Sequence, residues 1–411
     1  MDPLAGLAVA PSRSLVFCAF VGGGVALGTV SGLTPGVHAN TFALLLAGVA
    51  PAVPGPLSFV GAAMLAAGTV HTFLDVVPAL ALGVPDPAMA ASALPGHRLV
   101  LEGQGREAVR LSALGSGCAV VFAVPLAVPM TRVMTGVYPA LRAHLGVVLA
   151  GVAGLLVLTE RTPTAKVGAA LALGVSGALG AVALDLPTAG LVDAGNMLAP
   201  LFAGLFGAPV LLDALSGEGV PEQAEPTVTT PRPAVALFAL VGTLAGAVVG
   251  YLPGVSSAVA ATAALLAVPN AGARGWIVTT SGVNTANSVF ALFALVALGT
   301  PRTGVLVAVE RAGVTLNLPV LLAGVAAGAA AGAVLVVSVG DRYLETVGRL
   351  DYTRLSVGVL ALLVVLVAVL TGPVGIAIFA AATVVGLVPV AFRARRASLM
   401  GVLLVPLAVG A

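Results

Sequence analysis

The sequence predicts an all-α polytopic membrane protein with two repeats of inverted topology. Of its 411 residues, 59% are hydrophobic and only 8% are charged, whereas soluble globular proteins carry about a quarter charged residues. A transmembrane helix needs about 20 mostly apolar residues, so a chain of this length, after allowance for loops, holds roughly ten to twelve spans. These proportions exclude the water-soluble classes of protein.

Charge and cysteine content exclude further classes. The net charge is +2, and the only basic cluster is Arg393–Arg396, so we expect no nucleic-acid partner. Cys18 and Cys118 lie in apolar stretches without the spacing of a zinc site or a disulfide framework. We therefore expect no metal and no cofactor, apart from Na⁺ or H⁺ as a coupling ion. The apolar run from Leu15 has no clear cleavage site and is interpreted as a retained span.

Apolar runs bounded by charged residues, proline and glycine predict the membrane spans of the first half of the chain. The predicted spans are Leu15–Leu33, Leu57–Leu82, Leu111–Met130, Tyr138–Leu158, Val167–Leu184 and Met197–Leu212. Between the first two lies the short run Val37–Ala50, which is too short to cross a membrane alone. Its length is typical of a half-helix or a re-entrant segment.

A polar segment, Ser216–Pro233, separates this half from a second one. We interpret residues 1–215 as a first transmembrane repeat, 216–233 as a linker and 234–411 as a second repeat. The second half repeats the order of the first. Its predicted segments are Ala234–Tyr251, the short run Val255–Val268, Trp276–Leu298, Leu318–Val339, Leu355–Leu370, Val374–Phe392 and Ser398–Ala411.

Two motifs recur at a nearly constant offset, which is the signature of an internal repeat. Gly32–Val37, GLTPGV, and Gly250–Val255, GYLPGV, begin 218 residues apart. Ala81–Pro85, ALGVP, and Ala297–Pro301, ALGTP, begin 216 residues apart. Each Pro-Gly pair precedes one of the two short runs, so each half is expected to contain an interrupted helix.

The positive-inside rule indicates how the halves are oriented. If the loop Arg393–Arg396 is cytoplasmic and the spans alternate, the central linker is also cytoplasmic, and twelve basic residues lie inside against four outside. The inside set is Arg98, Arg106, Arg110, Arg161, Lys166, Arg232, Arg342, Arg349, Arg354, Arg393, Arg395 and Arg396; the outside set is Arg132, Arg142, Arg302 and Arg311. Corresponding loops of the halves then face opposite sides, as in many secondary transporters.

The Pro-Gly breaks predict an anion site near the bilayer midplane. Proline stops a helix and glycine permits the turn, and the half-helix that follows presents free backbone N–H groups that attract anions. The candidate substrate site comprises residues of both breaks and polar residues of the long run after the second break: Pro35, Gly36, Val37, His38, Asn40, Thr41, Pro253, Gly254, Val255, Ser256, Ser257, Asn284, Asn287 and Ser288. Plain interhelical turns are the alternative interpretation of these motifs.

The long runs carry further polar residues that hydrocarbon would penalise unless they are buried in protein or face a cavity. His71 and Asp75 are four residues apart, so they share a helix face and could take up a proton or help hold a cation. We interpret them as ion-coupling residues; a structural His–Asp hydrogen bond is the alternative. The second half offers hydroxyl and amide groups instead: Thr279, Thr280, Ser281, Asn284, Thr285, Asn287 and Ser288. Helix–helix hydrogen bonding is the alternative for this set.

At these residues the sequence resembles the large permease subunit family of tripartite tricarboxylate transporters, particularly its shorter archaeal members. The similar motifs are Gly32–Gly36, Pro95–Ala108, Tyr251–Gly254, Asn284–Ser288 and Ala297–Pro301. Asn284 stands where the family has an acidic residue, Arg302 replaces a glycine, and His38 stands where a small residue is commoner.

The resemblance implies a permease of the plasma membrane that imports carboxylates on an ion gradient. It also implies two partners, a small membrane subunit and an extracytoplasmic binding protein. Whether the permease forms a homodimer is open.

Two other functions remain as alternatives. Gly174–Gly177, GVSG, is similar to the serine turn of rhomboid proteases, which would make the protein an intramembrane enzyme. Small residues of this kind also arise for helix packing, and neither HExxH nor paired intramembrane aspartates accompany the motif. We therefore expect no enzyme activity. The second alternative is an assembly subunit without transport activity, which would have little need for polar clusters in both repeats.

Overall fold

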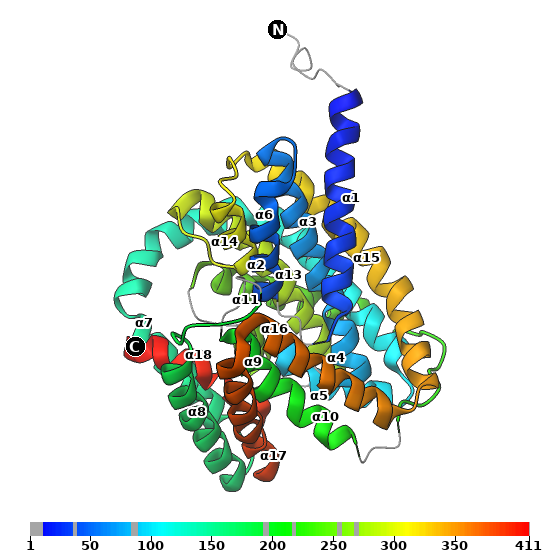
Figure 1. Ribbon diagram of the computed structural model, residues 1–411, viewed down its shortest axis with the longest axis vertical. Coiled ribbons are helices and arrows are strands. Elements are labelled where there is room, and N and C mark those ends of the chain that lie inside the picture. The colour runs from blue at the N-terminus through cyan, green and yellow to red at the C-terminus, as the bar shows by residue number, and fades with distance from the viewer. Residues whose placement is uncertain are drawn as a thin grey trace.

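The structure is a computed structural model that describes residues 11–35, 39–83, 89–191, 197–215, 219–252, 257–266 and 271–410. Within these residues the secondary structure is helical (Figure 1). The elements of the first half are α1 (Pro11–Leu33), α2 (Ala39–Val49), η1 (Ala50–Ala52), α3 (Leu57–Leu74), α4 (Val76–Leu82), α5 (Ala90–Leu101), α6 (Gly105–Ala143), α7 (Leu145–Leu158), α8 (Pro163–Ala183), α9 (Leu198–Phe202), η3 (Ala203–Gly207) and α10 (Ala208–Ala214).

The second half follows the extended linker. Its elements are α11 (Arg232–Tyr251), α12 (Ser257–Leu266), α13 (Gly272–Leu298), α14 (Gly304–Arg311), α15 (Leu318–Arg349), α16 (Tyr352–Gly386), α17 (Val388–Ala391), η4 (Arg396–Met400) and α18 (Gly401–Val409).

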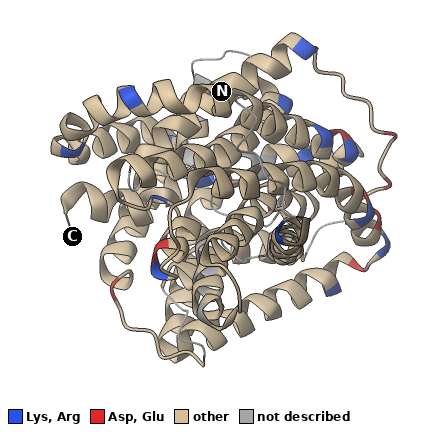
Figure 2. Cartoon of the chain, turned by 90° about the horizontal axis from the view of Figure 1, so that it is seen from above, with Lys and Arg blue, Asp and Glu red and all other residues tan. Residues whose placement is uncertain are grey.

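The prediction of an all-α polytopic membrane protein is confirmed. Eight segments of the described chain are long and apolar enough to cross a membrane: Pro11–Leu33, Leu57–Leu82, Gly105–Ala143, Pro163–Ala183, Arg232–Tyr251, Gly272–Leu298, Leu318–Arg349 and Tyr352–Ala391. Three shorter apolar helices accompany them: Leu145–Leu158, Leu198–Asp213 and Arg396–Val409. Figure 2 shows long stretches of these helices without a charged residue.

The boundaries of some spans differ from the predicted ones. Residues 111–130 and the start of the next predicted span, from Tyr138, belong to one 39-residue helix, α6, which ends only at Ala143. Three prolines lie inside α6 without ending it, as transmembrane helices tolerate. The break expected between Leu370 and Val374 is present: Gly372 has φ 71°, which bends α16 sharply (Figure 1).

Glycines set the packing of α1 on α3. Gly24, Gly28 and Gly32 lie four residues apart on one face of α1, and a Cβ at any of them would overlap α3, at Gly32 with the Leu74 Cβ at 2.8 Å. Small residues let membrane helices approach closely. Because Gly24 meets Ala63 and Gly28 meets Ala67, the two helices run parallel.

The second half builds the same kind of pair from α11 and α13. A Cβ at Gly242 would lie 2.5 Å from the Thr279 carbonyl oxygen. At Gly246 it would lie 2.8 Å from the Val283 carbonyl oxygen. These glycines, with Gly250, stand 218 residues after the three of α1. In both halves, the helix before the Pro-Gly loop is therefore fixed by glycine contacts to the long helix after the loop.

The long helices exchange partners between the halves. α15 of the second half packs on α3 of the first half, where a Cβ at Gly324 would lie 2.5 Å from the Ala62 carbonyl oxygen. Conversely, α6 of the first half packs on α13 of the second half, where Ser112 and Ser281 bond through their hydroxyls at 2.8 Å. The halves are thus interlocked rather than placed side by side.

The remaining helices form a second group. α18 packs on α7 and α8, and η4 packs on α8 (Figure 1). Their apolar side chains join those of α9, η3 and α16 in one buried cluster that includes Phe202, Phe206 and Leu399.

The linker is held against the ends of the long helices. The Ala224 N–H donates to the Gly103 carbonyl at 2.8 Å, and the Gly105 N–H donates to Gln223 Oε1 at 2.7 Å. Glu107, which is 5% exposed, accepts from the N–H and the hydroxyl of Thr229 and from Arg274.

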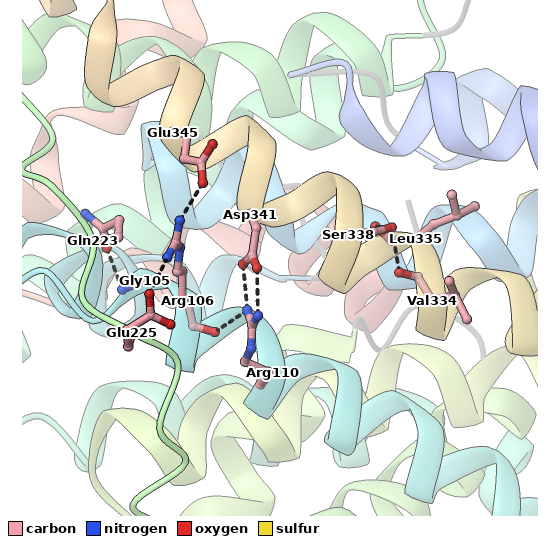
Figure 3. Close-up of polar contacts among 10 residues, drawn as sticks. All are labelled: Gly105, Arg106, Arg110, Gln223, Glu225, Val334, Leu335, Ser338, Asp341 and Glu345. Atoms are coloured by element: carbon pink, nitrogen blue, oxygen red, sulfur yellow. Dashed lines mark hydrogen bonds and ion pairs between the residues drawn. The ribbon is translucent and has the colours of Figure 1, made fainter.

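Ion pairs add to this end of the bundle (Figure 3). Arg110 makes two hydrogen bonds of 2.6 Å to Asp341, and Arg106 pairs with Glu345. Charged residues of α6, α15 and the linker thus meet at one end of the bundle.

Candidate functional site

The helices that precede the two Pro-Gly loops contact the long helices within their length. Gly32 contacts α3 at His71, near the middle of the 26-residue segment Leu57–Leu82. Gly250 contacts α13 at Phe290, where a Cβ would lie 2.8 Å from the Phe290 Cβ, inside the 27-residue segment Gly272–Leu298. Each loop therefore begins well within the length of a spanning helix.

Part of the predicted site lies outside the described residues. This part comprises Gly36, Val37, His38, Pro253, Gly254, Val255 and Ser256, and the side chains of Asn40 and Thr41. The described members are Pro35 and Ser257, which are buried, and Asn284, Asn287 and Ser288 on α13. The helices that follow the loops, α2 and α12, begin at Ala39 and Ser257.

His71 joins α1, α2 and α3. Its side chain is fully buried, and its Nδ1 lies 2.9 Å from the Ser31 hydroxyl, two residues before the end of α1. The Phe42 ring, in the first turns of α2, stacks on the imidazole with the ring centroids 6.0 Å apart and an interplanar angle of 9°. His71 thus contacts the elements on both sides of the first Pro-Gly loop.

Asp75 joins the two halves. It lies at the junction of α3 and α4, is buried, and accepts a hydrogen bond of 2.7 Å from the Asn284 amide. A buried carboxylate needs such donors because burial disfavours the charged form. The structure therefore brings a predicted coupling residue and a predicted substrate residue into direct contact.

A row of hydroxyl groups continues from this contact. Thr72 and Thr285 lie 3.3 Å apart through their side-chain oxygens, and Thr285 donates to the Ser116 hydroxyl at 2.8 Å. Thr72 pairs with Thr285 while Asp75 pairs with Asn284, so residue numbers run in opposite order along α3 and α13. The alternative interpretation as interhelical hydrogen bonding fits these hydroxyls well.

Two polar atoms on α13 have no hydrogen-bond partner within the described chain. They are the Asn287 side-chain oxygen and the Thr280 hydroxyl, and both are buried. Buried polar groups are normally paired with protein or water, so an unpaired acceptor in this position favours an external donor or cation. Asn287 lies one turn beyond Val283, whose carbonyl faces Gly246 of the helix before the second Pro-Gly loop.

The chemistry of this region is that of hard oxygen ligands. Carboxylate, amide and hydroxyl oxygens suit Na⁺ or a proton, and free N–H groups at the start of a half-helix suit a carboxylate. Among the described residues, no three or more His, Cys, Asp or Glu side chains are grouped so as to hold a transition metal.

Sequence reasoning did not identify Ser31, Phe42, Ser112 or Ser116. For Ser112 and Ser116 a signal was available, because they are two polar residues four apart in an apolar span. Ser31 directly precedes the first Pro-Gly motif. Phe42 carries no sequence signal, since an aromatic residue in an apolar run is usually part of the core.

Residues 18–401 match the sequence model of the tripartite tricarboxylate transporter TctA family. An uncharacterized protein of Methanocaldococcus jannaschii is 25% identical over 338 residues, which cover 81% of this chain and 82% of that protein. No solved structure matches the chain.

Proposed function

The chain belongs to the tripartite tricarboxylate transporter TctA family, and from this premise we propose that it is an ion-coupled permease for small di- and tricarboxylates. The substrate would be held near the bilayer midplane between the N-termini of α2 and α12. Gly36 to Thr41 and Gly254 to Ser257 supply its donors, with Asn284, Asn287 and Ser288 beside them. Alternating access would come from movement of one group of helices against the other.

A single observation carries this proposal. Both helices that lead into the Pro-Gly loops contact a long span within its length and not at its end, at His71 of Leu57–Leu82 in one half and at Phe290 of Gly272–Leu298 in the other. Interrupted helices at the midplane are how many secondary transporters expose backbone groups to a substrate without exposing them to lipid.

We infer that the two halves are inverted repeats. The equal glycine spacing of α1 and α11, the parallel pairs that they form and the reciprocal packing of α6 and α15 support a common design. The opposite order of residues along α3 and α13 supports the inversion.

For sidedness, we propose that the central linker and the loop Arg393–Arg396 are cytoplasmic. Contacts between loops agree with the charge count, because they join loops assigned to one side. Arg395 pairs with Glu160 beside Arg161, and Arg106 pairs with Glu345 and Glu225, which the count places inside. Arg302 bonds the Tyr138 hydroxyl, at the end that the count places outside. The plasma membrane is the proposed location.

Coupling is proposed to involve Asp75 and His71. Asp75 lies at the contact between the halves, and His71 contacts the helix before the first loop. A change in charge at either residue would therefore alter a contact between elements that are proposed to move. We expect Asp75→Asn to keep the Asn284 contact but to make transport independent of the pH or Na⁺ gradient. An unchanged gradient dependence would remove Asp75 from this role.

The partners proposed are a small membrane subunit and an extracytoplasmic binding protein, in keeping with a tripartite system. The enzyme alternative gains no support from the structure. The Ser176 hydroxyl donates to the Leu173 carbonyl of its own helix, and Gly177 packs against Val405 of α18. These small residues therefore serve the contact between α8 and α18.

Binding is tested by the melting temperature of the purified protein. The panel is citrate, succinate, phosphate and sulfate, each with Na⁺ or with K⁺ at matched ionic strength. A ligand of the native state at 100 times its Kd stabilises by about 2.7 kcal/mol. We expect a carboxylate to raise the melting temperature more with Na⁺ than with K⁺, and Asn287→Ala to abolish the rise. Stabilisation by phosphate or sulfate alone would contradict the proposed substrate class.

A further inference from the structure

Two adjacent arginines at the start of η4 differ in how their charges are satisfied. Arg395 is held by several hydrogen bonds, and its backbone N–H and its Nε both donate to Glu160 at 2.9 Å. Its Nη2 bonds the Thr159 hydroxyl and the Leu156 carbonyl. Arg395 is thus the residue that fastens η4 to the turn between α7 and α8.

Arg396 is buried without such partners. The residue is 8% exposed, and its Nη1 is inaccessible to solvent and has no hydrogen-bond partner in the part of the chain that the structure describes. The opposing charge that acts on it is that of Asp213, which is itself exposed. Two residues on, the buried Ser398 hydroxyl also lacks a partner.

A role as a membrane-surface anchor does not account for Arg396. Arginines with that role extend the guanidinium into water and bury only the aliphatic stem. Arg393, in the same loop, is exposed and fits that description. Burying a guanidinium with an unused N–H group is costly, so a protein that does so normally supplies an anion to it.

The position of η4 connects this cation to the proposed site. Ala397, Leu399 and Met400 belong to the same buried cluster as Leu252 and Ala260, which lie on either side of the second Pro-Gly loop. In addition, η4 contacts α12, the helix that follows this loop, and α5.

We propose that Arg396 is the cationic group of a carboxylate-binding site beside the second Pro-Gly loop, with Ser398 as a further donor. The proposal rests on the proposed function and makes it more specific, because one carboxylate of a di- or tricarboxylate is bound by a guanidinium in addition to helix N-termini. A guanidinium matches a carboxylate with two parallel N–H···O bonds, which an ammonium cannot reproduce.

The test compares Arg396→Gln with Arg393→Gln, a matched control in the same loop. Melting temperatures of the purified full-length proteins are measured against citrate and succinate, with sodium chloride at equal ionic strength as the reference. A second arm adds phosphatidylglycerol or phosphatidylcholine, because a lipid phosphate has the same chemistry as a carboxylate. Arg396→Lys, which keeps the charge, serves if Arg396→Gln does not fold.

We expect Arg396→Gln to raise the apparent Kd for the stabilising carboxylate roughly 10- to 100-fold, as loss of a charged hydrogen bond implies, and Arg393→Gln to leave it unchanged. Arg396→Lys should weaken binding about tenfold, because it loses the two-bond geometry. Equal Kd values for wild type and Arg396→Gln, equal losses in both glutamine variants, or a response to phosphatidylglycerol alone would overturn the assignment. If the Arg396 assignment fails but the protein still takes up carboxylates, the proposed transport function stands. If carboxylates bind through Arg396 but are not taken up, the binding site stands and the transport function fails.

Discussion

At the scale of single residues, two asparagines one turn apart on α13 are in different situations. Asn284 donates to the buried carboxylate of Asp75, whereas the Asn287 side-chain oxygen has no partner in the described chain. A paired amide contributes to folding, and an unpaired one is tolerated only if it serves another purpose. The contrast separates an amide that is paired with a carboxylate of the other half from an amide whose oxygen is available to a ligand.

Replacing each asparagine by leucine tests this contrast. Asn284→Leu removes the donor from Asp75, and we expect the free energy of unfolding to fall by about 1–3 kcal/mol. Asn287→Leu should cost less stability but abolish carboxylate binding. Denaturation in detergent and the anion panel measure the two effects. Equal stability losses in the two variants would contradict the distinction.

His97 gives a prediction about pH. It lies on α5, outside the candidate spans, and burial lowers the pKa of its imidazole, although the bond to the Leu80 carbonyl, 2.6 Å from Nδ1, opposes this. With a lowered folded pKa, the unfolded chain binds the proton more readily, so the stabilising contribution is present above about pH 6.5 and is lost as pH falls toward the folded value. The wild type should therefore lose stability between pH 7 and 5.

A variant comparison isolates this contribution. His97→Gln, which retains a side-chain donor for Leu80, should flatten part of the fall in melting temperature, and His144→Gln, at an exposed histidine, should not. Identical pH profiles for the wild type and His97→Gln would show that the imidazole is not the titrating group.

At the scale of elements, the glycine face of α1 explains why the first loop is held beside α3. Gly28 lies against the backbone of Ala67, whereas a Cβ at Gly22 would meet nothing within 4 Å. Gly28→Val should therefore push the helices apart and destabilise the protein by about 1–3 kcal/mol, as overpacking does. Gly22→Val, on the exposed face, should be close to neutral. Similar melting temperatures for the two variants would disprove the close contact.

Hydropathy and helix-breaking residues predicted the helix ends well where proline or glycine interrupts an apolar run. The ends of α1 and α11 at the Pro-Gly motifs, the short helices after them and the break near Gly372 follow from local chemistry. The length of α6 did not follow, because its prolines signal an end that its packing in the bundle overrides. Which helices pair was not predictable from apolar runs, since lipid and protein favour the same side chains.

At the scale of the whole molecule, the proposed inverted repeat predicts which loops share a face. In a background without Cys18 and Cys118, single cysteines at Thr227, in the linker, and at Thr315, between α14 and α15, should react with a membrane-impermeant thiol reagent from opposite faces. Both positions are exposed. Labelling from the same face would contradict the proposed topology.

The candidate site was predictable in part. Polar residues within long apolar runs drew attention to His71, Asp75 and Asn284, because hydrocarbon penalises such groups. Their partners were not predictable, since Asp75 and Asn284 are 209 residues apart and meet only through the crossing of α3 and α13. Arg396 carried no such signal, because it stands in the basic cluster Arg393–Arg396, and only the structure shows that it is buried.

Uptake of labelled citrate or succinate into proteoliposomes containing the purified protein is the most direct measurement. A preformed Na⁺ or pH gradient should drive accumulation of substrate above the level of empty vesicles, and collapsing that gradient with an ionophore should release the accumulated substrate. Asn287→Ala, still folded, should not accumulate substrate. No accumulation by the wild type under either gradient, with and without co-reconstituted membrane subunit and binding protein, would contradict the assignment as a carboxylate permease.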